Sequence, residues 1–493
     1  MSFAKVFSRS VVGLHASLIE VEVHLSQGLP ALTIVGLPEA AVRESKDRVR
    51  SAIINSNFHF PNKRLIINLA PADLPKDGSR LDLAIAIGIL IASEQIICNE
   101  ILEYEFTGEL ALNGDLRAVS GVLSIAHACQ QAQHRLFVPT DNAAQAACID
   151  KMSVYGAQNL KQVADHLNKR QALTVHQYMT PTVDNKILPD LTDVKGQMKA
   201  RRALEIAAAG GHSILFTGPP GTGKTLLASR LPSILPPLNS SESLEVANIY
   251  SIAGIEHAYG VRPFRSPHHT ASAVALVGGG SHPKPGEITL AHLGVLFLDE
   301  LPEFDRKVLE VLRQPLEAKE VIISRASRQV RFPADFQLIA AMNPCPCGYA
   351  FHQDKRCQCS IESIKRYKNR ISGPLLDRID LHIDVPPMSI DELQNQQASE
   401  SSTVVRQRVI TAYDQQYNRQ SSTNSALRPE KINEHIQLDD SSKKILAIAQ
   451  QRLQLSARAY HRILRVARTI ADLEQQELVS SLHITEALSY RPK

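Results

Sequence analysis

The chain has 493 residues, which is long enough for two or three domains that each bury a core of their own. It carries 54 lysine and arginine residues against 50 aspartate and glutamate residues, and this net charge of +4 indicates a polyanionic partner only weakly. No apolar run reaches the roughly 18 residues of a membrane helix, and the start lacks the apolar core of a secretory signal. We therefore expect a cytoplasmic protein with no membrane partner. In that reducing compartment, paired cysteines mark metal or redox chemistry more often than structural disulfides.

The first 168 residues predict a mixed α+β domain. Residues 16–37 alternate apolar and polar side chains around a QGLP turn, which predicts a β-hairpin. Helices are expected over 39–56 and 79–93, and strands over 63–71, 105–116 and 135–139. Residues 169–192 show no clear period and contain two prolines, which is typical of a linker. A second α/β pattern follows over 193–387, and a polar helical region over 388–493 completes the chain.

A phosphate-binding motif lies between an apolar strand and a helix at 213–231. It matches the pattern G-x-x-x-x-G-K-[ST], and its loop consists of Gly218, Pro219, Pro220, Gly221, Thr222 and Gly223. The backbone N–H groups of such a loop surround phosphate oxygens, and the helix N-terminus adds positive potential. Lys224 would reach the β- and γ-phosphates, and Thr225 would ligate Mg²⁺. The motif therefore predicts that the chain binds ATP with Mg²⁺.

Polar residues follow two further apolar strands. The strand 295–298 ends in Asp299 and Glu300, a pair that suits hydrolysis. Asp299 would hold Mg²⁺, and Glu300 would orient and polarise the attacking water. The strand over 336–342 ends at Asn343, a candidate for positioning that water or contacting the γ-phosphate. Arg378 stands just before another strand.

A helix over 456–473 has two faces at 3.6-residue spacing. Its apolar stripe contains Tyr460, Ile463, Leu464, Ala467 and Ile470, and the opposite face carries Arg458, Arg462 and Arg465. For Arg462 and Arg465, solvated charge is at least as good an interpretation as a functional role.

Four of the seven cysteines stand within residues 345–359, as two C-x-C pairs separated by nine residues. We expect Cys345, Cys347, Cys357 and Cys359 to bind one structural Zn²⁺ in a closed tetrahedral shell. Redox disulfides, free thiols and an iron–sulfur centre are the alternatives. The segment is also basic. Its cations Lys355, Arg356, Lys365, Arg366, Lys368 and Arg370 outnumber Asp354 and Glu362, so it is expected to contact DNA as well.

In this order, the motifs resemble those of AAA+ ATPases of the magnesium-chelatase-like family, and in particular its competence-associated members. The resemblance covers nearly the whole chain. It rests on the ATP motifs and on the stretches 36–53, 68–78, 264–280, 283–304 and 340–348. It implies an α/β AAA+ P-loop core over 193–387, a C-terminal helical lid over 388–493, and an α+β N-terminal domain that is similar to Lon proteases and ribosomal protein S5.

The resemblance also implies a ring, a homo-hexamer with ATP at the subunit boundaries. Within it, Asn343 resembles the sensor-1 residue, Arg378 the arginine finger that enters the neighbour's site, and Arg458 the sensor-2 arginine of the lid. Arg370 is an alternative finger. Such arginines neutralise charge that develops on the γ-phosphate.

The N-terminal domain departs from the Lon-type proteases that it resembles. The stretch PKDGSRLDL places Arg80 where those enzymes have their serine, so Ser79 is one position early, and the partner lysine falls near Leu123. Without a Ser–Lys pair in register, a nucleophile lacks its base. We expect a non-peptidase scaffold or collar, with surviving protease activity as a minor alternative.

Basic residues gather in two insertions that face the central channel in related ATPases. The first, over 259–287, carries Arg262, Arg265, His268, His269 and Lys284, and the second, over 319–333, carries Arg325, Arg328 and Arg331. These cations suit a phosphate backbone, although any single one could instead serve a subunit or nucleotide contact. The resemblance implies a branch-migration helicase that acts on single-stranded and branched DNA, with recombination proteins as further partners. The rival functions are the assistant ATPase of a metal chelatase and a protein unfoldase.

Overall fold

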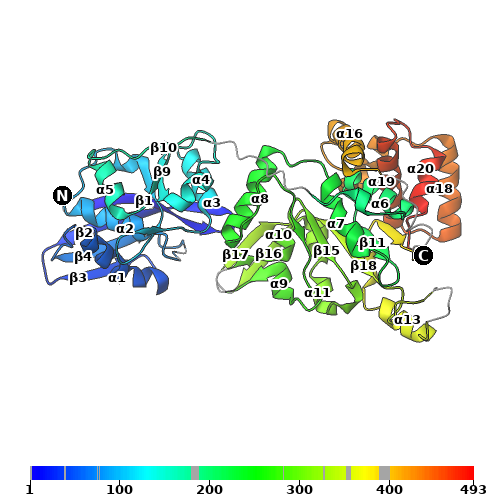
Figure 1. The fold of residues 1–493 in the computed structure, drawn as a ribbon, viewed down its shortest axis with the longest axis horizontal. Coiled ribbons are helices and arrows are strands. Elements are labelled where there is room, and N and C mark those ends of the chain that lie inside the picture. Colours follow the sequence, from blue (N-terminus) through cyan, green and yellow to red (C-terminus); the bar gives the residue numbers. More distant parts are fainter. Residues whose placement is uncertain are drawn as a thin grey trace. The chain divides into compact units, whose positions relative to one another are not determined.

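The computed structural model describes residues 3–37, 40–74, 76, 78–178, 188–280, 283–325, 328–350, 357–387 and 400–492. The chain divides into two compact units (Figure 1). Unit 1 contains Met1–Val183 and Ala247–Tyr259, and unit 2 contains Asp184–Val246 and Gly260–Lys493. The expected helical lid and most of the expected core thus lie in unit 2, whereas residues 247–259 of that core belong to unit 1. Within the described ranges, no helix is long and apolar enough to cross a membrane.

Unit 1 is built on an eight-stranded mixed sheet with the order β10-β9-β8-β5-β1-β2-β4-β3. Its strands are β1 (Phe3–Val12), β2 (His15–Ser26), β3 (Ala31–Val35), β4 (Arg64–Ala70), β5 (Tyr104–Phe106), β8 (Arg135–Pro139), β9 (Val154–Ala157) and β10 (Val175–His176). A short pair, β6 (Glu109–Leu110) and β7 (Leu116–Arg117), lies outside this sheet. The 3-10 turn η1 (Ile101–Glu103) precedes β5. Because β10 pairs with β9, the first part of the expected linker 169–192 belongs to this sheet.

The hairpin predicted over 16–37 is wrong. β2 pairs antiparallel with β1 through the turn at Gly13, and β4 lies between β2 and β3. β3 instead pairs parallel with β4, in register Ala31 with Arg64. Alternation of apolar and polar residues identified both strands correctly, but it does not specify which strands pair.

The helices of unit 1 are α1 (Ala40–Asn55), α2 (Asp82–Ala92), α3 (Val122–Gln131), α4 (Thr140–Ala146) and α5 (Leu160–Leu167). α2 is buried at every position except Ile91, and it packs against β1 and β2. Its Gly88 permits this close approach, because an added Cβ would lie 2.7 Å from Val23 and 3.1 Å from Val6. The predicted helices at 39–56 and 79–93 are confirmed.

Unit 2 is built on a five-stranded parallel sheet with the order β12-β15-β18-β11-β19. The strands are β11 (Ile214–Thr217), β12 (Phe264–Arg265), β15 (Val295–Leu298), β18 (Gln337–Met342) and β19 (Leu381–Asp384). β15 and β18 are buried throughout, as their continuous apolar runs predict. Since all five strands are parallel, the residues that follow β11, β15 and β18 meet at one edge of the sheet, where ligands bind in such folds.

Helices cover the sheet and form the C-terminal region (Figure 1). They are α6 (Met198–Gly210), α7 (Lys224–Ile234), α9 (Ala273–Val277), α10 (Glu287–Leu290), α11 (Arg306–Glu310), α12 (Arg313–Ala318), α13 (Ile361–Lys368), α14 (Gly373–Leu376), α16 (Ser402–Gln420), α17 (Ile432–His435), α18 (Asp440–Leu453), α19 (Ala457–Leu473) and α20 (Ser481–Leu488). α8 (Ser240–Ala253) begins in unit 2, and its residues from Ala247 onward belong to unit 1. Short hairpins are β13 (Gly278–Gly279) with β14 (Lys284–Pro285), and β16 (Glu320–Arg325) with β17 (Arg328–Pro333). The 3-10 turns are η2 (Leu191–Asp193), η3 (Leu301–Glu303), η4 (Asn424–Ala426) and η5 (Pro429–Lys431).

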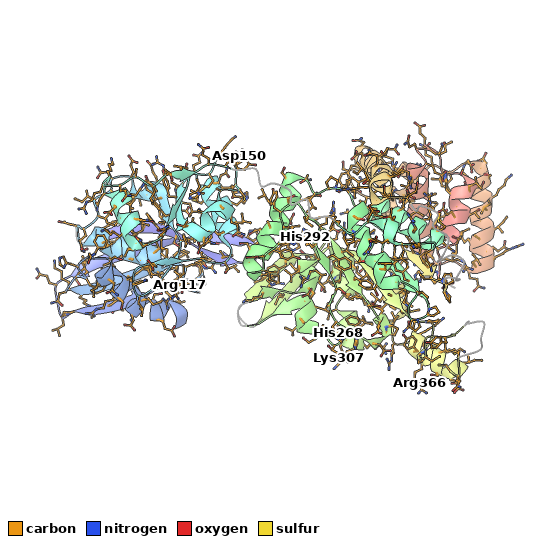
Figure 2. All side chains as sticks on the ribbon, viewed as in Figure 1. Arg117, Asp150, His268, His292, Lys307 and Arg366 are labelled. Atoms are coloured by element: carbon orange, nitrogen blue, oxygen red, sulfur yellow. The ribbon has the colours of Figure 1, made fainter. Side chains whose placement is uncertain are left out.

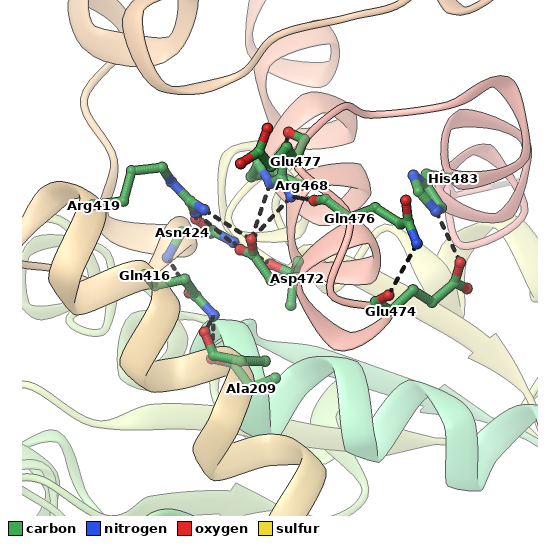
Figure 3. Close-up of polar contacts among 12 residues, drawn as sticks. Ala209, Gln416, Arg419, Asn424, Arg468, Asp472, Glu474, Gln476, Glu477 and His483 are labelled. Atoms are coloured by element: carbon green, nitrogen blue, oxygen red, sulfur yellow. Dashed lines mark hydrogen bonds and ion pairs between the residues drawn. The ribbon is translucent and has the colours of Figure 1, made fainter.

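A buried polar network fastens the C-terminal helices to one another (Figure 3). Asp472 of α19 accepts hydrogen bonds from Arg419 at 2.8 and 2.9 Å, from Arg468 at 3.1 Å and from Asn424 at 2.8 Å. Gln416 continues the network to the carbonyl of Ala209 in α6. Because the carboxylate of Asp472 is paired on several sides, its burial does not leave an uncompensated charge.

The same network reaches the ATPase sheet through His212. Its Nε2 lies 2.8 Å from Oγ1 of Thr469, and its Nδ1 lies 3.0 Å from Asp380, one residue before β19. Asn424 donates to the same Thr469 hydroxyl at 3.0 Å. The C-terminal helices are therefore bonded to the edge of the sheet at which its strands begin.

Candidate functional site

The phosphate-binding loop follows β11, and α7 begins at Lys224. Nζ of Lys224 donates to the carbonyl oxygens of Gly218 at 2.7 Å and Pro219 at 2.9 Å, and to Oδ1 of Asn343 at 3.2 Å. Burial lowers the pKa of Lys224, and the charges of Asp299 and Glu300 oppose that shift. The loop, the lysine and the polar end of β18 thus form one hydrogen-bonded group.

The two residues predicted to bind Mg²⁺ are in contact. Oγ1 of Thr225 donates to Oδ2 of Asp299 at 2.7 Å, and Oδ1 of Asp299 accepts from the backbone N–H of Glu300 at 2.9 Å. A hydroxyl and a carboxylate are hard oxygen ligands of the kind that Mg²⁺ prefers. Thr225 and Asp299 are therefore placed to hold the ion that accompanies ATP.

Glu300 has a backbone conformation that is uncommon for a residue other than glycine. Its φ is 52° and its ψ is 46°, in the left-handed region, at the start of η3. Oε2 of Glu300 lies 3.3 Å from Nδ1 of His269, which the sequence had assigned to DNA. The structure therefore places His269 at the carboxylate that the sequence predicts to orient the attacking water.

Asn343 and the turn that follows it have partners in two other segments. Tyr367 of α13 is buried; burial and the charge of Glu303 raise its pKa to about 12, against a smaller lowering by a hydrogen bond with the backbone of Asn343. A Cβ added to Gly348 would lie 2.7 Å from Pro220 in the phosphate-binding loop, and the glycine has a φ of 82°. The turn after Asn343 is thus packed against the loop that surrounds phosphate.

The four cysteines of the two C-x-C pairs come together. Their Sγ atoms all lie within 4.8 Å of one another. Cys345 lies 3.3 Å from Cys347 and 3.7 Å from Cys357, and Cys347 lies 3.5 Å from Cys357. Four sulfurs at ~2.3 Å from one Zn²⁺ in a tetrahedron would be ~3.8 Å apart, so the cluster needs little adjustment to hold the ion. A backbone hydrogen bond from Tyr349 is the main cause that lowers the pKa of Cys347 to about 6.

Arg378 and Arg458 lie together, and neither contacts the phosphate-binding loop in the described part of the chain. Arg378 binds Glu317, and Nη2 of Arg458 lies 3.1 Å from the same Oε1 atom of that carboxylate. Arg378 stands before β19, at the edge where the parallel strands begin. The loop lies beyond the other end of β11, a strand of four residues that spans about 13 Å. Neither arginine is therefore placed to reach phosphate in its own subunit.

The two arginines line a cavity of about 690 Å³ at the edge where the strands begin. Arg462 and Arg465 of α19 line it as well, and Arg462 donates to the carbonyl of Ile379 at 3.0 Å. Arg462 is only 7% exposed, and burial lowers the pKa of both arginines. The interpretation of Arg462 as solvated charge is therefore wrong, because its guanidinium group is buried and donates to the carbonyl of Ile379.

Arg370, the alternative finger, lies at the edge of the sheet that carries the nucleotide motifs. Its Nη1 donates to the carbonyl of Pro302 at 3.2 Å and lies 2.9 Å from Glu303, in the turn η3 directly after Glu300. This position differs from that of Arg378, and it allows contact with the site of its own subunit.

Two cations of the first insertion, Arg262 and Arg265, form hydrogen bonds or ion pairs with other groups of the same chain. Arg262 donates to the carbonyls of Pro236 and Leu293, both at 2.6 Å, and burial lowers its pKa. Arg265 forms a two-pronged ion pair with Glu287 at 2.6 and 2.7 Å. Carbonyl and carboxylate groups of the chain thus already bind these guanidinium groups, and a DNA contact of either residue stays a prediction.

The remaining predicted DNA contacts lie on exposed segments. His268 is exposed and hydrogen-bonded to Thr270 at 2.9 Å, and Lys284 is exposed on β14. The backbone register of the β16–β17 hairpin pairs Arg325 with Arg328. On α13, Lys365, Arg366 and Lys368 are exposed. Figure 2 shows Arg366, together with Lys307 and His268, along the lower margin of unit 2. Asp354, Lys355 and Arg356 lie outside the described residues.

The protease positions of unit 1 have other contacts. The hydroxyl of Ser79 binds the carboxylate of Glu109, and Leu123 is buried in α3. Arg80, at the position of the Lon serine, cannot act as an oxygen nucleophile.

Sequence reasoning missed His269 as a partner of Glu300, Tyr367 as a support for Asn343, and Glu317 as the acceptor shared by two arginines. The adjacent histidines 268 and 269 were visible as a motif, but only the sheet order places β12 beside β15. For Glu317 and Tyr367 the sequence carries no comparable signal.

Comparison with known proteins agrees with these observations over the whole chain. The family described as magnesium chelatase, subunit ChlI, matches residues 190–393, and two further ChlI descriptions match residues 21–142 and 399–491. Competence protein ComM of Haemophilus influenzae is 49% identical over 499 residues, covering 100% of this chain and 98% of that protein. Protein YifB of Escherichia coli is 47% identical over 495 residues, covering 100% and 97%.

A weaker similarity concerns the N-terminal part. Lon protease 2 of Bacillus subtilis is 26% identical over 226 residues, covering 41% of this chain and 39% of that protein. The α/β architecture, the P-loop after β11 and the matches along the full length agree with one another. The chain belongs to the magnesium-chelatase-like AAA+ family, in the part of that family that contains competence protein ComM.

Proposed function

We propose that the chain is an ATP-hydrolysing DNA motor. It works as a homo-hexameric ring, a branch-migration helicase that promotes integration of single-stranded DNA during natural transformation and recombination. One group of contacts is the observation that carries the ATPase activity. Lys224 binds Asn343, Thr225 binds Asp299, and Asp299 accepts from the backbone N–H of Glu300. Family membership supports the same activity.

In this mechanism, the loop 218–223 and Lys224 hold the phosphates of ATP. Thr225 and Asp299 would hold Mg²⁺, which would supply positive charge to neutralise the phosphates of ATP. Glu300 accepts a hydrogen bond from the attacking water and polarises it, and Asn343 fixes the far side of the γ-phosphate. Both residues follow buried strands, so they are held at the fixed spacing that hydrolysis requires.

The position of Arg378 supports a ring. Because it lies at the edge of the sheet away from its own P-loop, it can stabilise a γ-phosphate only in a neighbouring subunit. Arg458 shares Glu317 with it, so we assign both arginines to the neighbour's site and leave Arg370 to the subunit's own.

DNA as the substrate rests on the exposed cations of α13 and on exposed Lys284, and on the word competence in the name of the Haemophilus relative. Separate exposed cations suit a phosphate backbone, which is bound by charge neutralisation and counterion release. The cysteine cluster directly precedes α13, so a bound Zn²⁺ would fix the base of this cationic helix. The alternative is a chelatase-type or protein-remodelling ATPase, which the relation to magnesium chelatase favours.

The test is ATP hydrolysis by the purified protein with and without single-stranded and forked DNA. We expect strong stimulation by DNA, loss of ATP binding in Lys224→Ala, and ATP binding without turnover in Glu300→Gln. Normal turnover by Glu300→Gln would contradict the site. Hydrolysis that does not respond to either DNA would favour the protein-remodelling function.

A further inference from the structure

The carboxylate of Glu300 has a side-chain partner that none of the nucleotide motifs includes. Nδ1 of His269 lies 3.3 Å from Oε2 of Glu300, and the two side chains are 31% and 52% exposed. His269 follows β12, and Glu300 follows β15, the neighbouring parallel strand. The contact therefore joins the ends of two adjacent strands at the edge that carries the nucleotide site.

The imidazole ring of His269 is itself supported. It lies against the ring of His268 with centroids 4.1 Å apart, and it meets the edge of Phe304 at 6.5 Å and 80°. His268 is in turn hydrogen-bonded to Thr270. Upstream, the ion pair of Arg265 with Glu287 fixes the end of β12. Ring contacts of this kind limit the rotamers that His269 can adopt.

Glu300 needs such a support more than the other residues of the site. Asp299 is bonded to Thr225, and Lys224 is bonded to three oxygen atoms. Within the ranges that the structure describes, His269 is the only side chain within hydrogen-bonding or ion-pairing distance of the Glu300 carboxylate. A half-exposed glutamate has three side-chain torsions, and fixing them without a partner costs conformational entropy.

We propose that His269 is a positioning residue for Glu300. The contact of its Nδ1 with Oε2 would leave Oε1 free to accept a hydrogen bond from the attacking water. This assignment rests on the proposed hydrolysis of ATP, and it moves His269 from the DNA surface to the nucleotide site. His269 contacts no phosphate in this scheme, so its effect falls on turnover and not on ATP binding.

Steady-state ATP hydrolysis by full-length variants tests this role. We expect His269→Ala to lower kcat by about tenfold or more at nearly unchanged KM, because a misplaced carboxylate no longer meets the water at the right distance. His269→Asn and His269→Gln form a matched pair. The amide nitrogen of asparagine takes the place of Nδ1, whereas that of glutamine takes the place of Nε2. Asparagine should therefore restore most of the turnover, and glutamine should not.

Three further measurements complete the test. His127→Ala, which removes an exposed histidine of unit 1, should hydrolyse ATP like the unmodified protein, and all variants should melt within a few degrees of it. In a Glu300→Gln background, His269→Ala should cause no additional loss, since it acts through that carboxylate. Turnover of His269→Ala within twofold of normal, or equal losses in the asparagine and glutamine variants, would overturn the proposal. If Glu300→Gln itself turned over normally, the proposed function would fail first.

Discussion

Arg378 and Arg458 bind the same oxygen atom of Glu317. Arg378 precedes the last strand of the parallel sheet, and Arg458 opens the helix α19, so the carboxylate joins the ATPase sheet to the C-terminal helices. Two guanidinium groups around one carboxylate leave a net positive charge. The pair lines a cavity with Arg462 and Arg465, and a neighbour's γ-phosphate could enter there.

This arrangement predicts that the two arginines act as one unit on the neighbouring subunit. Arg378→Ala and Arg458→Ala should each bind ATP normally but lose hydrolysis, by about 10³-fold or more for an arginine finger. Mixing either variant with Lys224→Ala should recover turnover, because some interfaces of a mixed ring pair an intact P-loop with intact arginines. The measurement is ATPase activity across mixing ratios. Loss of ATP binding by the Arg378 variant alone would assign it to its own subunit.

Gly348 links the cysteine cluster to the phosphate-binding loop, and replacing it should impair ATP binding. An added Cβ would lie 2.7 Å from Pro220, and its φ of 82° disfavours any side chain. We expect Gly348→Ala to weaken ATP binding about tenfold or more, since the loop or the turn must shift. Binding of a fluorescent ATP analogue measures this. Gly373→Ala is the matched control, because an added Cβ there meets nothing within 4 Å. Equal affinities in both variants would contradict the contact.

The cysteine cluster should hold one Zn²⁺ per chain. We expect protein purified without a metal-affinity tag to contain about one zinc, and Cys357→Ser to lose it, because three thiolates no longer close the shell. DNA affinity should fall with the metal, since α13 begins two residues after Cys359. Elemental analysis and a DNA titration measure the two effects. Cys148→Ser, which removes a thiol of unit 1, should keep the zinc. Metal-free protein with full DNA affinity would rule the site out.

Local sequence predicted the elements that depend on neighbouring residues. The phosphate-binding loop is one, because its strand, its glycines and its helix are contiguous and their chemistry is fixed by that order. The buried strands that end in Asp299 and Asn343 are others, since four or more apolar residues in a row indicate burial on both faces. The cluster of four thiols was predicted from its pairing and is visible in the structure.

Pairings between distant segments could not be predicted in this way. β3 has the alternating pattern of a hairpin partner, yet it bonds to β4, which begins 33 positions after β3 begins, in the register Ala31 to Arg64. Arg265 and Glu287 carry charge in a basic insertion, but only the fold shows that they neutralise each other. A charge in a sequence does not indicate whether its partner is a phosphate or a carboxylate of the same chain.

The ion pair in the insertion leads to opposite predictions for two cations. Arg265→Ala should lower the free energy of unfolding by about 1–3 kcal/mol, because it leaves the partly buried Glu287 unpaired. Lys284→Ala should leave stability unchanged and weaken DNA binding, with a smaller dependence of affinity on salt. Chemical denaturation and DNA titrations at several salt concentrations separate the two. Loss of DNA affinity in Arg265→Ala without loss of stability would restore it as a direct contact.

The buried side chain of His382 should make the stability of unit 2 depend on pH. Its Nε2 donates to the carbonyl of Ile379 at 3.2 Å, and burial, assisted by the charge of Arg462, lowers its pKa to about 4. In the unfolded chain the pKa of histidine is about 6.5. Between these values the unfolded state binds a proton that the folded state does not, so the free energy of unfolding falls as the pH is lowered from about 6.5 towards 4. The contribution of this one group is at most ~3 kcal/mol.

His382→Gln should reduce that loss of stability, because glutamine keeps an N–H donor for the carbonyl of Ile379 but does not titrate. We expect the variant and the unmodified protein to unfold at similar denaturant concentrations at pH 5, and the unmodified protein to gain more between pH 5 and pH 7. His127→Gln is the control, because His127 is exposed on unit 1 and its replacement should leave the pH dependence unchanged. Parallel pH profiles for His382→Gln and the unmodified protein would show that this histidine is protonated in the folded state.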